Sequence, residues 1–157
     1  MAASPETLIR RQWDAWSKRP GGKRIFSLLL GRMVPYTGTI GARVEELSPG
    51  HAKVTLRDRR RVRNHLRSVH AVALLNLAEL ATGLAVNYAL PGGARSILKG
   101  LSMEYHKKAR GLLTAEATAP VLQDATEREL ELGTAIRDEA GDVVATAKAR
   151  WLIGPRK

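Results

Sequence analysis

The stretch Ser68-Val-His-Ala-Val-Ala-Leu-Leu-Asn-Leu-Ala-Glu-Leu-Ala-Thr-Gly-Leu-Ala-Val-Asn-Tyr-Ala-Leu90 is the only long, almost wholly apolar segment of this chain. Such a run predicts a helix that is buried on most of its faces, and Pro91-Gly92-Gly93 is expected to end it. One carboxylate, Glu79, lies in the middle of the run. A buried carboxylate is costly unless it is paired or used chemically. Glu79 is therefore the first candidate for a functional residue.

Apolar and polar residues alternate on both sides of this helix, as in strands with one buried face. Ser48-Pro49-Gly50 is expected to join two strands before the helix, and four more strands follow it. Gly111 and residues 138–142 are expected as hairpin turns. The sequence therefore predicts an α+β fold, with an antiparallel sheet of about six strands wrapped around one long central helix. The alternating apolar positions are Ile40, Ala42 and Val44; Ala52, Val54 and Leu56; Ile97, Leu101, Met103 and Tyr105 on one face; Leu113 to Val121; Leu130 to Ile136; and Val143 to Ile153.

The first 35 residues are expected to form a helical flank. Ser4-Pro5-Glu6 is typical of a helix start with proline in the first turn, and Leu8, Ile9, Trp13 and Trp16 follow at helical spacing. A second short helix is expected from Lys23 to Met33, closed by Pro35. The chain of 157 residues is thus interpreted as one domain, with a flank over 1–35 and the sheet and central helix over 36–157.

Composition limits the partners. The formal charge of +11 and the pI of about 10.7 favour an anionic partner, which could be nucleic acid, a membrane surface or a phosphorylated small molecule. Three tryptophans, three tyrosines and one phenylalanine are few for stacking on bases, so no specific nucleic acid is expected. Ile25 to Leu30 is much shorter than the ~20 apolar residues of a membrane span. We expect a cytoplasmic protein with no membrane span.

No metal or cofactor is expected. The chain has no cysteine, so it has no disulfide framework and no thiolate metal site. The four histidines show no HExxH spacing, and no GxxxxGK[ST] phosphate loop is present. The histidines are His51, His65, His70 and His106.

A three-residue pattern lies at the start of the apolar helix. Asn64 precedes His70 by six positions, and Glu79 follows His70 by nine. The predicted arrangement of strands around one central helix resembles the hotdog fold. The spacing of these three residues resembles the acyl-CoA thioesterase branch of that fold, which includes the phenylacetate-pathway enzymes and DUF4442-like proteins. The resemblance covers roughly residues 36–153, and Tyr105 through Gly111 is similar to another motif of that branch. The chain departs from the branch at Ala71-Val72, where two glycines are usual.

The geometry of a helix adds a constraint. Nine residues at about 100° each place His70 and Glu79 on opposite sides of one helix, ~13 Å apart along it. If both act on one substrate, two subunits must contribute, so a homodimer is implied, and a dimer of dimers stays open. Hotdog proteins are similarly dimeric.

The resemblance implies hydrolysis of a hydrophobic acyl thioester. The backbone N–H of Ala71, at the helix start, would stabilise the oxyanion. Glu79 of the partner would be general base or nucleophile. Asn64 would hold the water or the carbonyl oxygen, and His70 would bond the thioester region or fix the loop.

The remaining candidates would bind the substrate. Val72 lies at the helix start, and Asn76 and Thr82 are expected to orient Glu79 from three residues to either side. No cofactor is implied beyond the coenzyme A of the substrate itself, whose phosphates would meet basic side chains. Those basic side chains are Arg61, Arg63, Arg67, Lys108 and Arg110.

Other interpretations remain. Glu79 could be a structural acid paired across a dimer interface, His70 a structural residue and Asn64 a turn residue. His65 and Glu79, fourteen residues apart, have the separation found in hotdog hydroxyacyl dehydratases and hydratases, although the Pro-Gly helix start of those enzymes is missing. A non-catalytic acyl-thioester-binding protein is the third interpretation.

Overall fold

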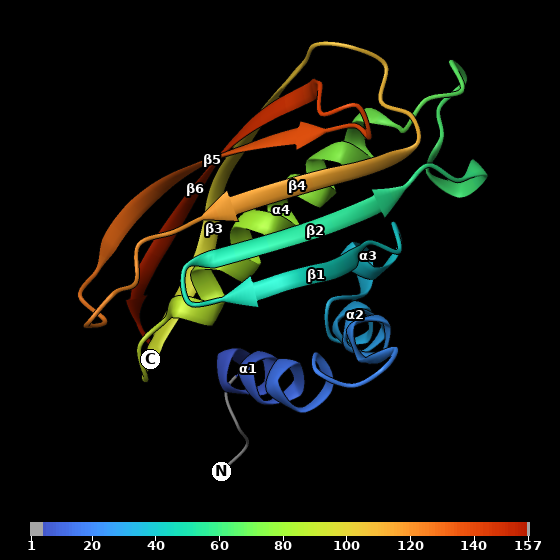
Figure 1. Cartoon of the computed structure of the whole chain (residues 1–157). Coiled ribbons are helices and arrows are strands. Elements are labelled where there is room, and N and C mark those ends of the chain that lie inside the picture. The colour runs from blue at the N-terminus through green and yellow to red at the C-terminus, as the bar shows by residue number, and fades with distance from the viewer. Residues whose placement is uncertain (1–4, 157) are drawn as a thin grey trace.

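The computed structural model describes residues 5–156, with side chains from residue 8 onward. Its six strands form one antiparallel sheet in the order β1-β2-β4-β5-β6-β3, which curls around the long helix α4 (Figure 1). This confirms the predicted α+β plan. The strands are β1 (Arg43–Ser48), β2 (His51–Arg57), β3 (Ala94–Tyr105), β4 (Leu112–Thr118), β5 (Arg128–Arg137) and β6 (Val143–Pro155), and the helices are α1 (Pro5–Trp16), α2 (Gly22–Met33), α3 (Pro35–Gly38) and α4 (Ala71–Ala89), with a 3₁₀ turn η1 (Arg60–Val62).

Helix α4 is the core of the fold, as its apolar run predicts. The small inward residues of the strands let the sheet approach it closely, and at Gly83 a Cβ would lie 3.1 Å from the Trp151 ring. By length and composition α4 could cross a membrane, with a mean hydropathy of 1.3, but 61% of that segment is buried inside the fold. Most of the apolar surface of the central helix is therefore buried within the protein.

Two details of the sheet correct the sequence-based prediction. A bulge at Lys99 shifts the register of β3 on β6, so Leu98 and Leu101 both pack on the core while Ile97 is exposed. The expectation that Ile97 and Leu101 share one face is therefore wrong. Gly111, with a φ of +72°, is not a hairpin turn, because β3 pairs with β6 and β4 pairs with β2 and β5. Period-two patterning does not reveal either a bulge or the order of strands.

The two edges of the sheet differ. At the β1 edge, the Ser27 hydroxyl of α2 accepts a hydrogen bond from the Val44 N–H at 2.9 Å. Helices α2 and α3 lie beside this edge in Figure 1, so part of it is covered. The other edge is β3, twelve residues long, and among residues 5–156 no strand pairs with its outer side. An uncovered edge of this length is available for pairing with another chain.

The helical flank confirms the two predicted helices. The Trp13 and Phe26 rings meet edge to face, 5.0 Å apart, and join α1 to α2. Arg10 of α1 donates to the carbonyls of Tyr88 and Leu90 at 2.7 and 2.6 Å, which satisfies the C-terminal end of α4. Pro35 begins the short helix α3 instead of simply ending α2. The Ser4 cap predicted for α1 lies outside the described residues.

Candidate active site

The start of α4 presents a free backbone donor. His70 is extended, with φ −64° and ψ 141°, and its Nδ1 accepts a hydrogen bond from the Val72 N–H at 3.1 Å. Within residues 5–156, the N–H of Ala71 has no hydrogen-bond partner. His70 therefore fixes the helix start, and Ala71, at the first helical position, keeps a donor for a ligand.

Tyr105 supports this donor from β3. Its hydroxyl donates to the carbonyl of Ala71 at 3.1 Å. Burial raises the pKa of the Tyr105 phenol, so the group stays protonated and able to donate at neutral pH. In the sequence, Tyr105 belongs to a motif, but the sequence assigned the residue no role. Its contact with Ala71 could not be predicted, because only the tertiary structure brings β3 against the start of α4.

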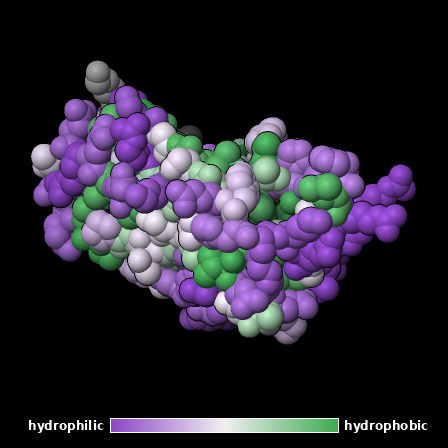
Figure 2. All heavy atoms as spheres, turned by 90° about the horizontal axis from the view of Figure 1, so that it is seen from above, coloured by the Kyte–Doolittle hydropathy of each residue, from purple (hydrophilic) through white to green (hydrophobic). Residues whose placement is uncertain are grey.

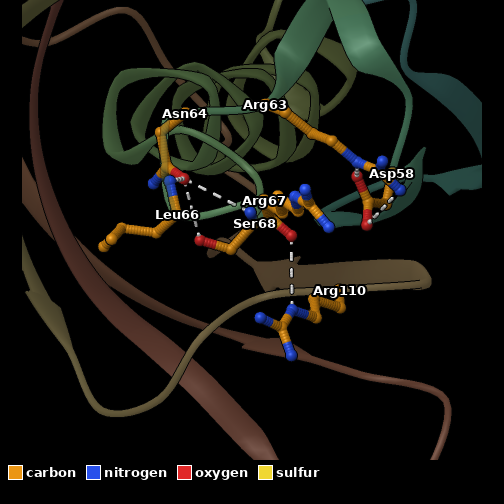
Figure 3. Close-up of polar contacts among 7 residues, drawn as sticks. All are labelled: Asp58, Arg63, Asn64, Leu66, Arg67, Ser68 and Arg110. Atoms are coloured by element: carbon orange, nitrogen blue, oxygen red, sulfur yellow. Dashed lines mark hydrogen bonds and ion pairs between the residues drawn. The ribbon is translucent and has the colours of Figure 1, made fainter.

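The Asn64 side chain organises the loop before α4 (Figure 3). Its Oδ1 accepts hydrogen bonds from the Leu66 N–H at 2.9 Å and from the N–H and hydroxyl of Ser68, both at 3.2 Å. Arg67 completes this tight turn with a φ of +54°. The side-chain carbonyl of Asn64 therefore acts as that of a turn residue, which was one of the two interpretations of Asn64. Its Nδ2 has no partner among the residues that the structure describes, so it remains available as a donor.

A small hollow of about 270 Å³ lies beside this loop and the helix start. It brings together Asn64 and Ala71, two of the predicted catalytic residues, and Tyr105 also lines it. Lys107 also lines the hollow, but its ammonium contacts Asp138 and Asp142 at 2.7 Å each and is neutralised. The lining residues are Asn64, Ser68, Val69, Ala71, Leu74, Tyr105, His106, Lys107, Lys108 and Ala109.

Glu79 lies on a different side of α4, as the helical geometry requires. Together with Val72 and Leu75 it forms a stripe of α4 that the sheet leaves partly open, and Val72 is 49% exposed. The half-buried carboxylate has no hydrogen bond or ion pair within residues 5–156. Burial raises the pKa of Glu79, because nothing nearby stabilises its charge. A single protomer therefore leaves this carboxylate unpaired.

Asn76 and Thr82 do not orient Glu79 within the protomer, contrary to expectation. Thr82 is completely buried, and its hydroxyl donates back to the carbonyls of Ala78 and Glu79 at 3.0 and 3.2 Å. The Asn76 amide donates to the Tyr36 carbonyl at 3.4 Å, while its Oδ1 is buried without a partner. Both side chains donate to backbone carbonyls, and Thr82 has no exposed surface to offer a substrate.

The predicted phosphate-binding cations do not form one cluster. Arg63 is held by Asp58 at 2.6 and 3.3 Å, and Arg110 donates to the Arg67 carbonyl at 3.3 Å (Figure 3). Arg61 instead donates to the Thr39 carbonyl, beside α3. Lys108 is the member of this set that lines the small hollow together with Ala71. The predicted basic side chains therefore lie in separate regions of the protomer.

The surface on the face that Figure 2 shows is of mixed hydropathy. On the face shown in Figure 2, hydrophilic side chains surround several separate hydrophobic patches.

His65, the residue of the dehydratase interpretation, is exposed in the loop and has no hydrogen bond among the described residues. No group of His, Asp and Glu within residues 5–156 could hold a metal ion.

Comparisons with known proteins agree with this fold. The profile of DUF4442, a domain of unknown function, matches residues 22–153. A structural-genomics protein, APC5556, is similar over 95% of this chain and 99% of its own, with 30% identity and a TM-score of 0.81. No curated protein matches at a significant level.

Two other crystal structures show the same fold at lower identity. A Pseudomonas aeruginosa protein described as a probable thioesterase is 23% identical, with a TM-score of 0.76, over 88% of this chain and 97% of its own. A mutant of the phenylacetic acid degradation protein PaaI from Thermus thermophilus is also 23% identical, with a TM-score of 0.64, over 75% of this chain and 97% of its own. From its profile match, this chain belongs to the DUF4442 family, and it has the hotdog fold of these solved structures.

Proposed function

We propose that this protein hydrolyses the thioester of a hydrophobic acyl-CoA, and that each active site combines two subunits. Glu79 of one subunit would activate water, and the Ala71 N–H of the other would stabilise the oxyanion. The site would lie in the cytoplasm and use no cofactor beyond the coenzyme A of its substrate. The fold neighbours named as thioesterases support this reaction class.

Glu79 is the observation that carries the proposal. A carboxylate that is half buried and unpaired on an otherwise mostly apolar helix costs free energy, and its raised pKa suits a general base. A purely structural acid would be expected to have a partner, and none lies within residues 5–156. An arginine of a second subunit could still supply one, so the experiments below separate the two roles.

The two-subunit arrangement follows from the same helix. The free N–H of Ala71 points out of the N-terminal end of α4, whereas Glu79 lies eight residues, or about 12 Å, further along the helix and projects from its side. The open stripe of Val72, Leu75 and Glu79 and the unpaired edge of β3 offer surfaces for a second copy. The apolar members of the stripe would then line the pocket for the acyl group.

The chemistry needs only these groups and water. Glu79 would take a proton from water as its oxygen attacks the thioester carbon, and the oxyanion would accept a hydrogen bond from the Ala71 N–H. Collapse of this intermediate breaks the carbon–sulfur bond, and the proton held by Glu79 passes to the leaving sulfur, which releases the acid and the thiol. The Asn64 Nδ2, which has no partner among the described residues, would hold the carbonyl oxygen or the water. His70 acts indirectly, because its ring caps the helix whose start supplies the donor.

Thiol release from short, medium, long and aromatic acyl-CoAs tests this proposal. Glu79→Gln should lower kcat by about 10²- to 10⁴-fold, the usual contribution of a general base. The matched control is Glu131→Gln on β5, which removes an exposed carboxylate that has no ion pair among the described residues. It should keep full activity. Absence of thiol release by folded wild-type protein on every substrate would refute the proposal.

The same variants separate catalysis from structure. If Glu79 is a structural acid paired across the interface, Glu79→Gln should weaken the dimer in sedimentation experiments and lower its unfolding temperature. If Glu79 is the base, the dimer and its unfolding temperature should be kept or improved while turnover is lost. Turnover that survives in Glu79→Gln would remove Glu79 from the mechanism.

A further inference from the structure

A second and much larger hollow lies between the α2–α3 flank and the covered edge of β1. Its volume is about 1030 Å³, and its charge is strongly one-sided. Six arginines line it against one carboxylate, that of Glu45. The arginines are Arg24, Arg32, Arg43, Arg57, Arg59 and Arg61.

Two of these guanidinium groups converge on one point. Arg59 donates to the Gly41 carbonyl at 2.9 Å, and Arg61 donates to the neighbouring Thr39 carbonyl. A Cβ on Gly41 would lie 3.1 Å from Arg59 Nη2 and 3.2 Å from Arg61 Nη2. Glycine suits this position for two reasons. Its φ of +63° is a conformation that other residues rarely adopt, and the missing Cβ leaves space for the two guanidinium groups. The two positive groups are therefore held close together by the backbone.

The one carboxylate of the hollow does not neutralise this pair. Glu45 Oε1 already lies 3.2 Å from Arg43 Nε and accepts a hydrogen bond from the Thr55 hydroxyl at 3.2 Å. Among residues 5–156, neither Arg59 nor Arg61 forms an ion pair. Each guanidinium has five N–H donors, and the contacts to carbonyls leave most of them free. Like charges held together without a counter-ion favour binding of an anion.

We propose that this hollow binds a small molecule through its phosphate groups, with Arg59 and Arg61 as the principal contacts. Paired guanidinium forks match phosphate oxygens in geometry as well as in charge. Arg57 and the α2 arginines Arg24 and Arg32 surround the pair and would contact further phosphates. The N-terminal flank thereby becomes part of a binding site, in addition to covering the edge of β1.

The phosphates could come from two sources. One is the nucleotide end of the acyl-CoA substrate, and this source rests on the proposed thioesterase function. Leu80, next to Glu79 in sequence, lines the hollow and connects it to the central helix. The other source is a free nucleotide that binds independently of catalysis. Both share the chemistry of a phosphorylated nucleotide, and they are separated by experiment.

Direct binding is the first arm of that experiment. Adenosine 3′,5′-bisphosphate is titrated calorimetrically into the full-length protein at low salt. Arg59→Gln and Arg61→Gln should each weaken binding by about tenfold or more, and the double variant by more than either, since each removes a charge-assisted contact. The matched control is Arg60→Gln, because Arg60 is exposed between the two and does not line the hollow. It should change the affinity by less than about threefold.

The calorimetric binding result tests the proposal independently of thioester hydrolysis. Unchanged binding in the double variant, or an equal loss in Arg60→Gln, would overturn it. Arg59→Lys with Arg61→Lys keeps the charge but removes the forks, so it tests the same contacts if the glutamine variant fails to fold. Intermediate affinity in the lysine variant would support the fork geometry.

Kinetics then identify the source of the phosphates. With acyl-CoA as substrate, the double glutamine variant should raise KM by about tenfold or more, whereas KM for the same acyl group on pantetheine, which lacks the nucleotide, should stay unchanged. Lost binding with an unchanged KM for acyl-CoA would assign the site to a free nucleotide. Bisphosphate binding that depends on the two arginines, in a protein that hydrolyses no thioester, would refute the proposed function and leave this site standing.

Discussion

Replacing Ala71 by proline would remove one backbone N–H and little else. Ala71 is the first helical residue of α4, where proline is readily accepted, and its N–H has no partner among residues 5–156. The preceding residue, His70, already has the extended conformation that proline demands, with φ −64° and ψ 141°. No intrahelical hydrogen bond is lost, so the fold should tolerate the change and could gain about 0.4–1 kcal/mol from a stiffer unfolded chain.

The catalytic effect should be much larger than the structural one. Losing one oxyanion donor costs about 10²- to 10³-fold in kcat, or ~2.7–4 kcal/mol. Ala71→Val is the matched control, because it adds comparable bulk to the partly buried position while keeping the N–H. We expect Ala71→Pro to lose turnover of acyl-CoA with an unchanged unfolding temperature, and Ala71→Val to keep most of it.

Mixing subunits makes the same variant a test of the dimer. Glu79→Gln and Ala71→Pro should each be nearly inactive as homodimers. After joint refolding at equal concentrations, half of the dimers should contain one subunit of each kind, and one of their two sites should be intact. About a quarter of the wild-type activity should therefore return. No recovery despite confirmed exchange of subunits, or full activity of Ala71→Pro alone, would refute the two-subunit mechanism.

Three further predictions follow from the described contacts. Because burial raises the pKa of Glu79 above its value in the unfolded chain, wild-type stability should fall as pH rises above the ordinary glutamate range, and Glu79→Gln should lack this fall. In urea unfolding, Glu79→Gln should be more stable than the wild type at pH 7. The two proteins should be equally stable near pH 3–4, below the unfolded pKa of about 4.3. Equal stability of the two proteins at both pH values would contradict the burial of Glu79. Asn64→Ala should lower the free energy of unfolding by about 1–3 kcal/mol, since Oδ1 accepts three hydrogen bonds, whereas Asn64→Asp keeps that acceptor and should fold normally but lose turnover if Nδ2 binds the substrate. Leu75→Lys places a charge in the open stripe of α4 and should give monomers in sedimentation experiments, with Leu66→Lys, in the exposed loop, as a control that stays dimeric.

Much of this fold could be predicted from local patterns. A strand or a helix with one buried face repeats its apolar residues with a fixed period, so α1, α2, α4 and the six strands are visible in the sequence. The pattern fails where a single residue changes the register, as Lys99 does in β3. It also fails for Gly111, because conformation alone does not show which strands a glycine connects.

The site was only partly predictable for the same reason. The spacing of Asn64, His70 and Glu79 depends on a few turns of chain, so the sequence determined that His70 and Glu79 lie on opposite sides of one helix. Only the tertiary structure decided which polar groups are already occupied. Thr82 bonds its own helix, Arg63 bonds Asp58, and the Asn64 carbonyl closes a loop.

The contacts that depend on distant segments were beyond any local pattern. Tyr105 reaches Ala71 from 34 residues away, and Arg61 reaches Thr39 from 22. The sequence by itself determined the main helices and strands, the buried central helix and its one costly carboxylate, because these follow from periodicity and burial. The tertiary structure alone decided the free donors and the convergence of Arg59 with Arg61, because a hydrogen-bond partner is chosen by spatial proximity and many residues compete for it.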